Sequence, residues 1–181
     1  MGEPKAGAML GGRALIAYPI DAVRAAGLDP VVVAKPGTPL PNLTCEVIRE
    51  RDGRRHPAAG ILAGLRAADG GGVVVVACDM PFVEPELIRF LAGLGAAVVV
   101  PRVRGRLEPL LARYSPAAIP ALEAALARGA ALQEAIDGPD TAVIDEGELA
   151  RFGEPGRMTS SVNDRAELES AERLLAAGAT R

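Results

Sequence analysis

The chain has 181 residues, 49% of them hydrophobic, and a formal net charge of −3 at pH 7. This length predicts one domain over residues 1–181, and the weak charge argues against nucleic-acid binding. No apolar run approaches the about 18 uncharged residues that span a bilayer, and no secretory signal is visible, so we expect a cytoplasmic protein that does not contact a membrane. Cys45 and Cys78 are too few for a disulfide framework or a zinc site.

Helix-like and strand-like segments alternate along the chain, which is the pattern of an α/β layer fold. The first half predicts a helix over 13–27, a strand over 29–34, a Pro-rich loop over 36–44, a strand over 45–48 and, after a basic stretch, a helix over 57–68. The second half predicts a strand over 73–76, a helix over 85–94, a strand over 96–100, an Arg-rich hairpin turn at 102–106 before segment 107–114, helices over 116–128 and 131–136, a strand over 141–144 and a terminal helix over 166–177.

The most informative stretch is Val73–Val76, followed by Asp79. Four consecutive valines predict a strand buried on both faces, as in parallel sheets that helices cover. Asp79 then lies at the carboxyl end of the strand, where open α/β sheets bind ligands. Two interpretations are open: Asp79 caps the next helix or turns the chain, or it binds a metal that faces a nucleotide phosphate.

The usual hydrolytic motifs do not occur in the sequence. His56 is the only histidine, and there is no GxSxG elbow, GxxxxGK[ST] phosphate loop or GxGxxG turn. Transfer of a nucleotide to a phosphate fits this composition, because the acceptor is already ionised and needs no general base. The protein would then hold Mg²⁺, shield the triphosphate and align the attack.

Four segments, in order along the chain, are similar to motifs of the molybdenum cofactor guanylyltransferase (MobA) family. HPAAGI at 56–61 resembles the family's GPLAGI loop, and residues 60–88, which include VVVVACDMPF, resemble its core motif. RLEPLLARY at 106–114 resembles its QPLFALY region, and SVNDRAEL at 161–168 resembles its NxNTPEDL signature. The resemblance covers nearly the whole chain.

This resemblance implies an α/β fold of three layers, Rossmann-like, of the nucleotide-diphospho-sugar transferase type, with a mostly parallel central sheet. It implies Mg²⁺-dependent transfer of GMP from GTP to the terminal phosphate of molybdenum-molybdopterin, with pyrophosphate released. The partners would be these small-molecule substrates and, transiently, other proteins of cofactor biosynthesis, for a monomer or homo-oligomer. CTP in place of GTP, another phosphorylated acceptor, a sugar-nucleotide synthase and a non-catalytic relative are the alternatives.

The resemblance also assigns roles to residues. Asp79 would bind Mg²⁺ with help from Asn163, and Lys5 would neutralise phosphate. The residues that would border the nucleotide are Gly11, Gly12, Lys35, Glu50, His56, Pro57 and Gly60, and those that would hold the acceptor's phosphate are Arg102, Arg104 and Arg106. Simpler interpretations are open too: the arginines form a solvated turn, His56 caps the next helix, Gly60 permits a close backbone approach, and Lys5 is a solvated terminal residue.

The beginning of the chain departs from the family. The family opens with a strand and a LAGGxSxRMGxxK loop, whose backbone amides cradle the triphosphate. Residues 1–6 resemble only the end of that loop, and from Lys5 the match continues against KALLPLGGRPLI. A sheet without that central strand would leave two rows of unpaired backbone groups. We therefore expect the natural protein to be longer, with its start misplaced at Met1; a compensating partner or an inactive chain is the alternative.

Overall fold

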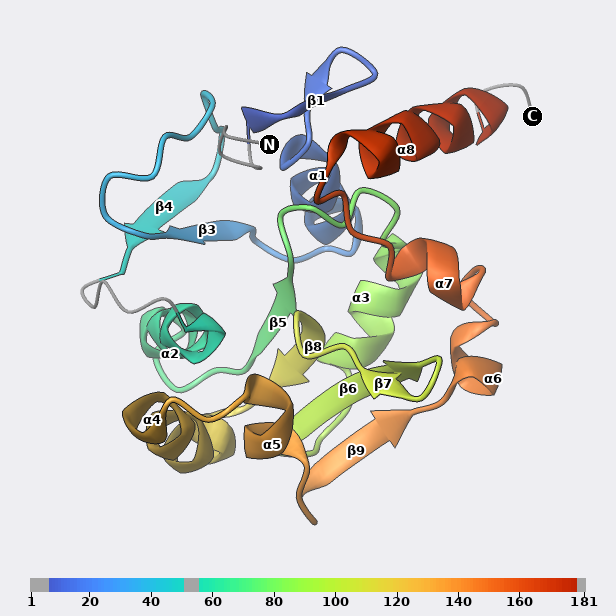
Figure 1. Ribbon diagram of the computed structural model, residues 1–181. Coiled ribbons are helices and arrows are strands. Elements are labelled where there is room, and N and C mark those ends of the chain that lie inside the picture. Colours follow the sequence, from blue (N-terminus) through green and yellow to red (C-terminus); the bar gives the residue numbers. More distant parts are fainter. Residues whose placement is uncertain (1–6, 51–55, 179–181) are drawn as a thin grey trace.

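The structure is a computed structural model that describes residues 7–50 and 56–178 (Figure 1). The predicted site residue Lys5 lies outside this range. The strands are β1 (Met9–Leu10), β2 (Arg13–Ala14), β3 (Val31–Ala34), β4 (Glu46–Arg49), β5 (Val73–Val76), β6 (Val98–Val103), β7 (Arg106–Leu107), β8 (Leu111–Tyr114) and β9 (Thr141–Ile144). The helices are α1 (Ala17–Ala25), α2 (Pro57–Ala67), α3 (Pro85–Ala92), α4 (Ile119–Arg128) with a 3₁₀ turn before it (Pro116–Ala118), α5 (Leu132–Ile136), α6 (Glu146–Leu149), α7 (Pro155–Met158) and α8 (Arg165–Gly178).

The strands of the described residues form three hydrogen-bonded groups. β1 and β2 make a small hairpin, β3 and β4 make a parallel pair, and β5, β8, β6, β7 and β9 make a five-stranded sheet. β8 is antiparallel to both β5 and β6, and β9 is parallel to β6. The longer strands β5, β6 and β9 therefore run in one direction with β8 reversed among them, which confirms the expected α/β class.

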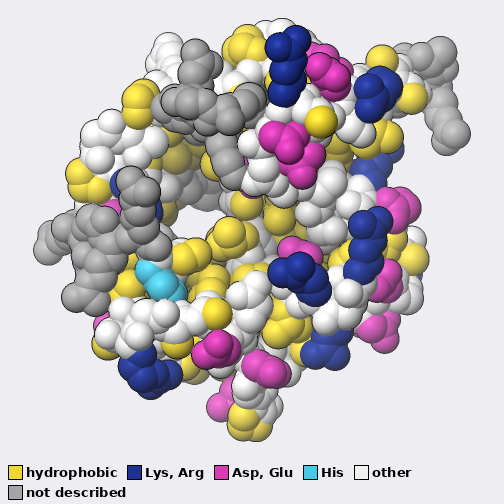
Figure 2. Space-filling model, in the orientation of Figure 1, with side chains coloured by type: hydrophobic (Ala, Val, Ile, Leu, Met, Phe, Trp, Pro, Cys, Tyr) yellow, Lys and Arg dark blue, Asp and Glu magenta, His cyan; other side chains and the backbone are white. Residues whose placement is uncertain are grey.

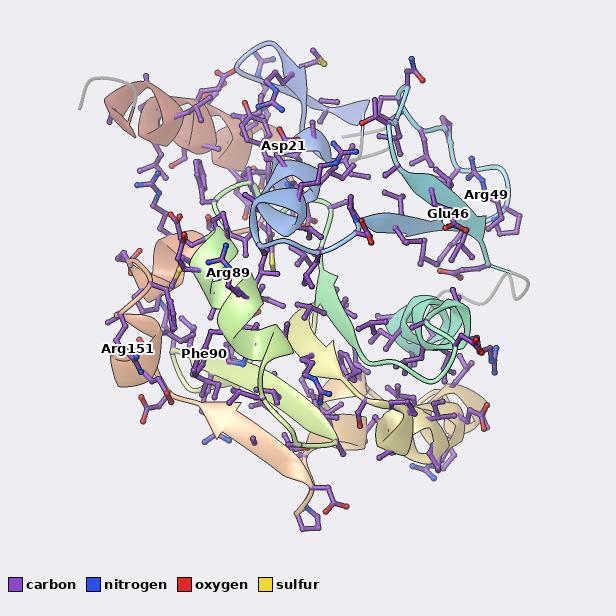
Figure 3. The ribbon with its side chains drawn as sticks, turned by 180° about the vertical axis from the view of Figure 1, so that it is seen from behind. Asp21, Glu46, Arg49, Arg89, Phe90 and Arg151 are labelled. Atoms are coloured by element: carbon purple, nitrogen blue, oxygen red, sulfur yellow. The ribbon has the colours of Figure 1, made fainter. Side chains whose placement is uncertain are left out.

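Helices cover both faces of the five-stranded sheet, which gives the three layers. Alternate residues of β6 point to opposite faces. Val99 and Val103 pack in one apolar cluster with α1 and α3, whereas Val98 and Val100 pack in a second cluster with α2, α4 and α5. Seen from behind, α1 and α3 lie in front of the sheet (Figure 3).

Helices α1 and α3 are joined by a hydrogen bond as well as by apolar packing. The Arg89 guanidinium on α3 donates to the carbonyl of Ala25 at 2.8 Å. On the same helix, the ring of Phe90 lies 5.0 Å from that of Phe152, between ring centroids. These contacts fix α1 and α3 in the helical layer that covers one face of β5 and β6.

The first predicted helix is wrong at its start. The prediction began it at residue 13, but Arg13 and Ala14 pair with β1 around a turn formed by Gly11 and Gly12. Both glycines have positive φ, at 55° and 80°, as a two-residue hairpin turn requires. The short helices α6 and α7, capped by Asp145 and Glu154, were not predicted, because one helical turn leaves little periodicity in a sequence.

The prediction that β5 is buried on both faces is confirmed only in part. Val73, Val74, Val75 and Val76 are only half-buried, although apolar clusters pack on both faces of the strand. The exposure therefore comes from the lateral edge of β5 that does not face β8. None of the helices in the described parts of the chain is long and apolar enough to cross a membrane.

Candidate active site

Asp79 lies in a tight turn directly after β5. The N–H of Ala77 donates to the carbonyl of Leu110 at 2.8 Å, which anchors the end of β5 to the segment before β8. The N–H of Met80 then donates to the carbonyl of Ala77 at 3.2 Å and turns the chain. The N-cap residue of α3 is Glu84. The interpretation of Asp79 as a helix cap is therefore wrong, and Asp79 belongs to the turn at the carboxyl end of the strand.

Asn163 is held beside this turn by the segment that precedes α8. The N–H of Val162 donates to the backbone carbonyl of Asp79 at 2.9 Å. The N–H of Asn163 donates to the carboxylate of Glu167 at 2.5 Å, and the N–H of Glu167 donates to the carboxylate of Asp164 at 2.9 Å. This reciprocal arrangement is a form of capping box at the start of α8. The hydrogen bond from Val162 explains why Asn163, more than 80 residues away in sequence, lies next to Asp79.

A cleft of about 880 Å³ opens beside Asp79 and Asn163, a volume suited to a small-molecule ligand. The turn between β6 and β7 and the segment after it contribute Arg104, Arg106 and Glu108 to its lining. The cleft thus brings together an acidic group and an amide from one side of the fold with two guanidinium groups from the β6–β7 hairpin.

The arginine-rich hairpin is exposed, and it contacts α6 and α7. The backbone N–H of Arg104 donates to the carboxylate of Glu146 on α6 at 2.6 Å. Its guanidinium reaches α7, where a Cβ placed on Gly156 would lie only 2.9 Å from the Arg104 Nη2 atom. Arg102, by contrast, is not among the described residues that line the cleft, because it precedes Val103 on β6 and points to the opposite face.

Glu108 is a cleft residue to which the sequence assigned no role, although it lies in the motif at 106–114. Burial raises the pKa of its carboxyl, and the nearby Arg106 charge opposes that rise. The loop that carries it is held by Tyr114, which is fully buried and donates from its hydroxyl to the carbonyl of Pro109 at 2.8 Å. Burial also raises the pKa of Tyr114, so its hydroxyl stays a donor.

The raised pKa of Glu108 predicts a pH dependence of stability. The folded chain binds this proton more tightly than the unfolded chain, so the free energy of unfolding falls as pH rises above the ordinary pKa of 4.5. A Glu108→Gln variant lacks this titration, so its stability should fall less than that of the parent between pH 4.5 and 7. Urea unfolding over a pH series tests this, with the exposed Glu172→Gln on α8 as the matched control. Identical pH profiles for the parent and Glu108→Gln would contradict the prediction.

A second group of predicted residues lies around β3, β4 and α2. Lys35 follows β3, and its carbonyl accepts from the Arg49 guanidinium at 3.1 Å. Glu50 follows β4 and is only 8% exposed. One of its carboxylate oxygens lies 3.2 Å from the position that a Cβ on Gly60 would take. The structure thus brings Lys35, Glu50 and Gly60 together, and Gly60 permits the close approach expected of it.

His56 is the N-cap residue of α2, as the simpler interpretation had it. Its Nδ1 accepts from the N–H of Ala58 at 3.1 Å, and its Nε2 lies 2.7 Å from the carbonyl of Ala130. The two contacts agree with one tautomer, in which Nε2 carries the proton and donates. Pro57 follows as the first helical residue, where its missing N–H costs nothing. Both ring nitrogens of His56 therefore make contacts that stabilise the fold.

We expect His56→Ala to lower the free energy of unfolding by about 1 kcal/mol, because the helix loses its cap. His56→Asn keeps an acceptor that can cap the helix, and it should recover part of that loss. Urea unfolding of both variants measures the difference. Equal stability of the parent and His56→Ala would show that the cap contributes nothing.

Gly11 and Gly12 lie at the tip of the β1–β2 hairpin and are not among the described residues that line the cleft. A Cβ on Gly11 would come within 2.6 Å of Leu175 on α8, so this hairpin packs closely on the last helix. The structure therefore places Asp79, Asn163 and Arg106 in one cleft, and Lys35, Glu50 and Gly60 in a separate group near α2.

The side chains of Asp79 and Asn163 are of types that bind Mg²⁺, but they are too few to complete its coordination. In residues 7–50 and 56–178, no three His, Cys, Asp or Glu side chains form a metal-binding group. Mg²⁺ is commonly held by one or two carboxylates together with substrate phosphates and waters. The residues that would hold Mg²⁺ at the edge of the cleft are Asp79, through its carboxylate, and Asn163, through its amide oxygen.

Comparison with known proteins relates the chain to one family. The profile of the MobA-like NTP transferase domain matches residues 1–142. A molybdenum cofactor guanylyltransferase of Desulfosudis oleivorans is 33% identical over 185 residues, which cover 98% of this chain and 90% of that protein. One of Pseudomonas putida is 41% identical over 113 residues, but the match spans only 58% of that protein's length and 56% of this chain.

Solved structures share the fold of this chain. The molybdopterin-guanine dinucleotide biosynthesis protein A of Archaeoglobus fulgidus superposes with a TM-score of 0.80 at 25% identity, over 97% of this chain and 92% of that one. The 2-C-methyl-D-erythritol 4-phosphate cytidylyltransferase of Thermus thermophilus shares the fold, with a TM-score of 0.69 at 22% identity over 94% of this chain and 93% of that one.

Proposed function

Because the chain belongs to the MobA-like NTP transferase family, we propose that it transfers GMP from GTP to the terminal phosphate of a molybdopterin-type acceptor. In this reaction an oxygen of the acceptor phosphate attacks the α-phosphorus of GTP. The bond from that phosphorus to the bridging oxygen breaks, and pyrophosphate leaves. The proposal extends to this chain the activity in the names of its relatives.

The observation that carries the proposal is the meeting of Asp79, Asn163 and Arg106 at one cleft. The three come from distant parts of the sequence, and only the fold brings them together. An acidic group and an amide suit a hydrated divalent cation, and guanidinium groups suit phosphate oxygens. Mg²⁺, when bound, would supply positive charge that stabilises the triphosphate as the bond to pyrophosphate breaks.

We assign the acceptor's phosphate to Arg104 and Arg106. Both lie on a hairpin that is anchored to α6 and α7, so their charges are held at the cleft before the substrate arrives. An acceptor phosphate is already ionised near neutral pH, so the residues of the cleft need only hold and align it. Glu108 beside them would discourage binding of a second anion in the same part of the cleft.

We assign the nucleotide to the other group of residues. Lys35 and Glu50 follow the two parallel strands β3 and β4, at the carboxyl edge where α/β sheets bind nucleotides. The buried carboxylate of Glu50 next to Gly60 suits the N–H groups of a base. Lys5, a member of the matched region, would neutralise phosphate charge.

Calorimetry of GTP and CTP binding, with and without Mg²⁺, tests the proposal. We expect Mg²⁺-dependent binding of GTP that is tighter than that of CTP, and pyrophosphate release only when a molybdopterin-type acceptor is added. If the chain bound CTP more tightly than GTP, the base assigned to the nucleotide site would be cytosine and not guanine. The proposal would be abandoned if neither nucleotide bound at millimolar concentration while circular dichroism showed a folded chain.

A further inference from the structure

Three consecutive hydroxyl side chains line the cleft between α7 and α8. They belong to Thr159, Ser160 and Ser161. The hydroxyl of Thr159 donates to the carbonyl of Pro155 at 2.9 Å, and that of Ser160 donates to the carbonyl of Arg157 at 2.7 Å. Both bonds run back to carbonyls of α7, as hydroxyls that follow a helix by three or four residues commonly do. The contacts of Thr159 and Ser160 are therefore local ones.

The hydroxyl of Ser161 has a different use. Its Oγ atom accepts from the Nδ2 atom of Asn163 at 2.7 Å. Asn163 is exposed, lines the same cleft, and is the residue that would hold Mg²⁺ together with Asp79. Of the three hydroxyls, that of Ser161 thus contacts a side chain of the proposed cation site.

The backbone around this contact is already fixed. Val162 is 2% exposed, and its N–H donates to the carbonyl of Asp79 at 2.9 Å. The N–H of Asn163 donates to the carboxylate of Glu167. What remains to be set is the rotation of the Asn163 side chain, whose terminal torsion has no narrow preference of its own. The contact with Ser161 restrains that rotation.

The two ends of the Asn163 amide differ in what they can do for a cation. The oxygen can coordinate it, whereas the NH₂ group carries donor hydrogens and repels positive charge. A bond that keeps the nitrogen end on Ser161 turns the oxygen end away from Ser161. Contacts of this kind behind a metal ligand orient the ligand and strengthen metal binding.

The orientation of the amide matters because the cleft also carries positive charge. Figure 2 shows basic side chains beside acidic ones on the face where β7 and α7 lie. Arg104 and Arg106 line the cleft together with Asp79 and Asn163, and their guanidinium groups disfavour a cation while no phosphate is bound. A cation in this cleft therefore depends on ligands whose oxygen atoms are already directed toward it.

We propose that Ser161 is a positioning residue of the cation site: its hydroxyl holds the Asn163 amide so that the oxygen, and not the nitrogen, is presented to a divalent cation at Asp79. This role rests on the proposed function only in requiring a cation at the cleft. The alternative is that the Ser161–Asn163 bond closes a turn before α8 and does nothing else. In that case its loss would leave cation binding unchanged.

Paramagnetic broadening by Mn²⁺ tests this role without substrate or turnover. Mn²⁺ accepts the same oxygen ligands as Mg²⁺, and it is added to the isotope-labelled chain in the absence of nucleotide. The readout is the Mn²⁺ concentration that halves the nuclear magnetic resonance signal of the Asp79 backbone amide. The amide of Glu172, on the exposed face of α8 and outside the cleft, reports non-specific binding.

Ser161→Ala should raise that Mn²⁺ concentration about tenfold, the loss typical when a contact behind a metal ligand is removed. Ser161→Thr keeps the hydroxyl and should stay within about twofold of the parent. Ser115→Ala is the matched control, because it removes a half-buried hydroxyl that is not part of the cleft lining. In a chain that already carries Asn163→Ala, Ser161→Ala should add nothing, since the amide that it holds is absent.

The positioning role is overturned if Mn²⁺ broadens Asp79 no more readily than Glu172 in the parent, or if Ser161→Ala binds Mn²⁺ as the parent does. An equal loss with and without Asn163→Ala would also overturn it, because the effect of Ser161 would then not pass through the amide. Calorimetry with GTP addresses the proposed function separately. A chain that shows the Ser161-dependent Mn²⁺ site but binds no GTP would support the positioning role and refute the nucleotide assignment.

Discussion

Asp79→Ala is expected to lower kcat/KM for pyrophosphate release by about 10³-fold, the largest effect on activity that the structure predicts. The substitution removes the carboxylate at the carboxyl end of β5 and keeps the backbone carbonyl that accepts from Val162. The turn and the position of Asn163 should therefore survive. Steady-state kinetics with GTP and the acceptor, at saturating Mg²⁺, measures the loss.

Glu172→Ala on the exposed face of α8 is the control for Asp79→Ala, since it removes an exposed carboxylate outside the cleft. We expect its kinetics to equal those of the parent. Calorimetry adds a second readout: Asp79→Ala should lose the Mg²⁺-dependent part of GTP affinity and keep the rest. Full activity of Asp79→Ala would remove this residue from the metal site.

Leu91→Ala is expected to lower the free energy of unfolding by about 3 kcal/mol, the largest effect on stability. Leu91 is 0% exposed on α3 and belongs to the apolar cluster that joins α1 and α3 to β6. Removing its side chain leaves a cavity between two layers that are already in close contact. Urea unfolding followed by circular dichroism measures the change.

Leu174→Ala on α8 is the control for this experiment, because the same atoms are removed from a side chain that is 38% exposed. Its cost should stay below about 1 kcal/mol. If both substitutions cost the same, the cluster around α3 would not be the main apolar core of the sheet.

The sequence alone predicted most elements to within a few residues. The strand at Thr141–Ile144 has the predicted bounds, and the helix predicted to stop at Gly129 does so, with that glycine at a φ of 65°. Local signals suffice for such features, because capping, turn residues and hydrophobic periodicity act over a few positions. The N-terminal hairpin was missed because strands of two residues leave no period to detect.

For the candidate site as well, the sequence predicted some features and missed others. The end of the valine run predicted the place of Asp79, because strand and turn are encoded by adjacent residues. The sequence did not distinguish the two uses proposed for His56. The structure shows that its Nδ1 caps α2 through the N–H of Ala58, while its Nε2 contacts the carbonyl of Ala130, 74 residues away. Arg102 was grouped with Arg104 and Arg106, yet only the latter two line the cleft, because the pleat of β6 turns Arg102 to the other face.

By itself, the sequence determined the α/β class, the order of the elements and the chemical character of each strand end. These follow from side-chain polarity and backbone preference, which act locally. Only the tertiary structure decided which strand ends meet, that Asn163 lies beside Asp79, and that Val73–Val76 remain half-buried. Those features depend on which edges pair and which helices cover them, and such contacts join residues far apart in the chain, whose proximity no local pattern records.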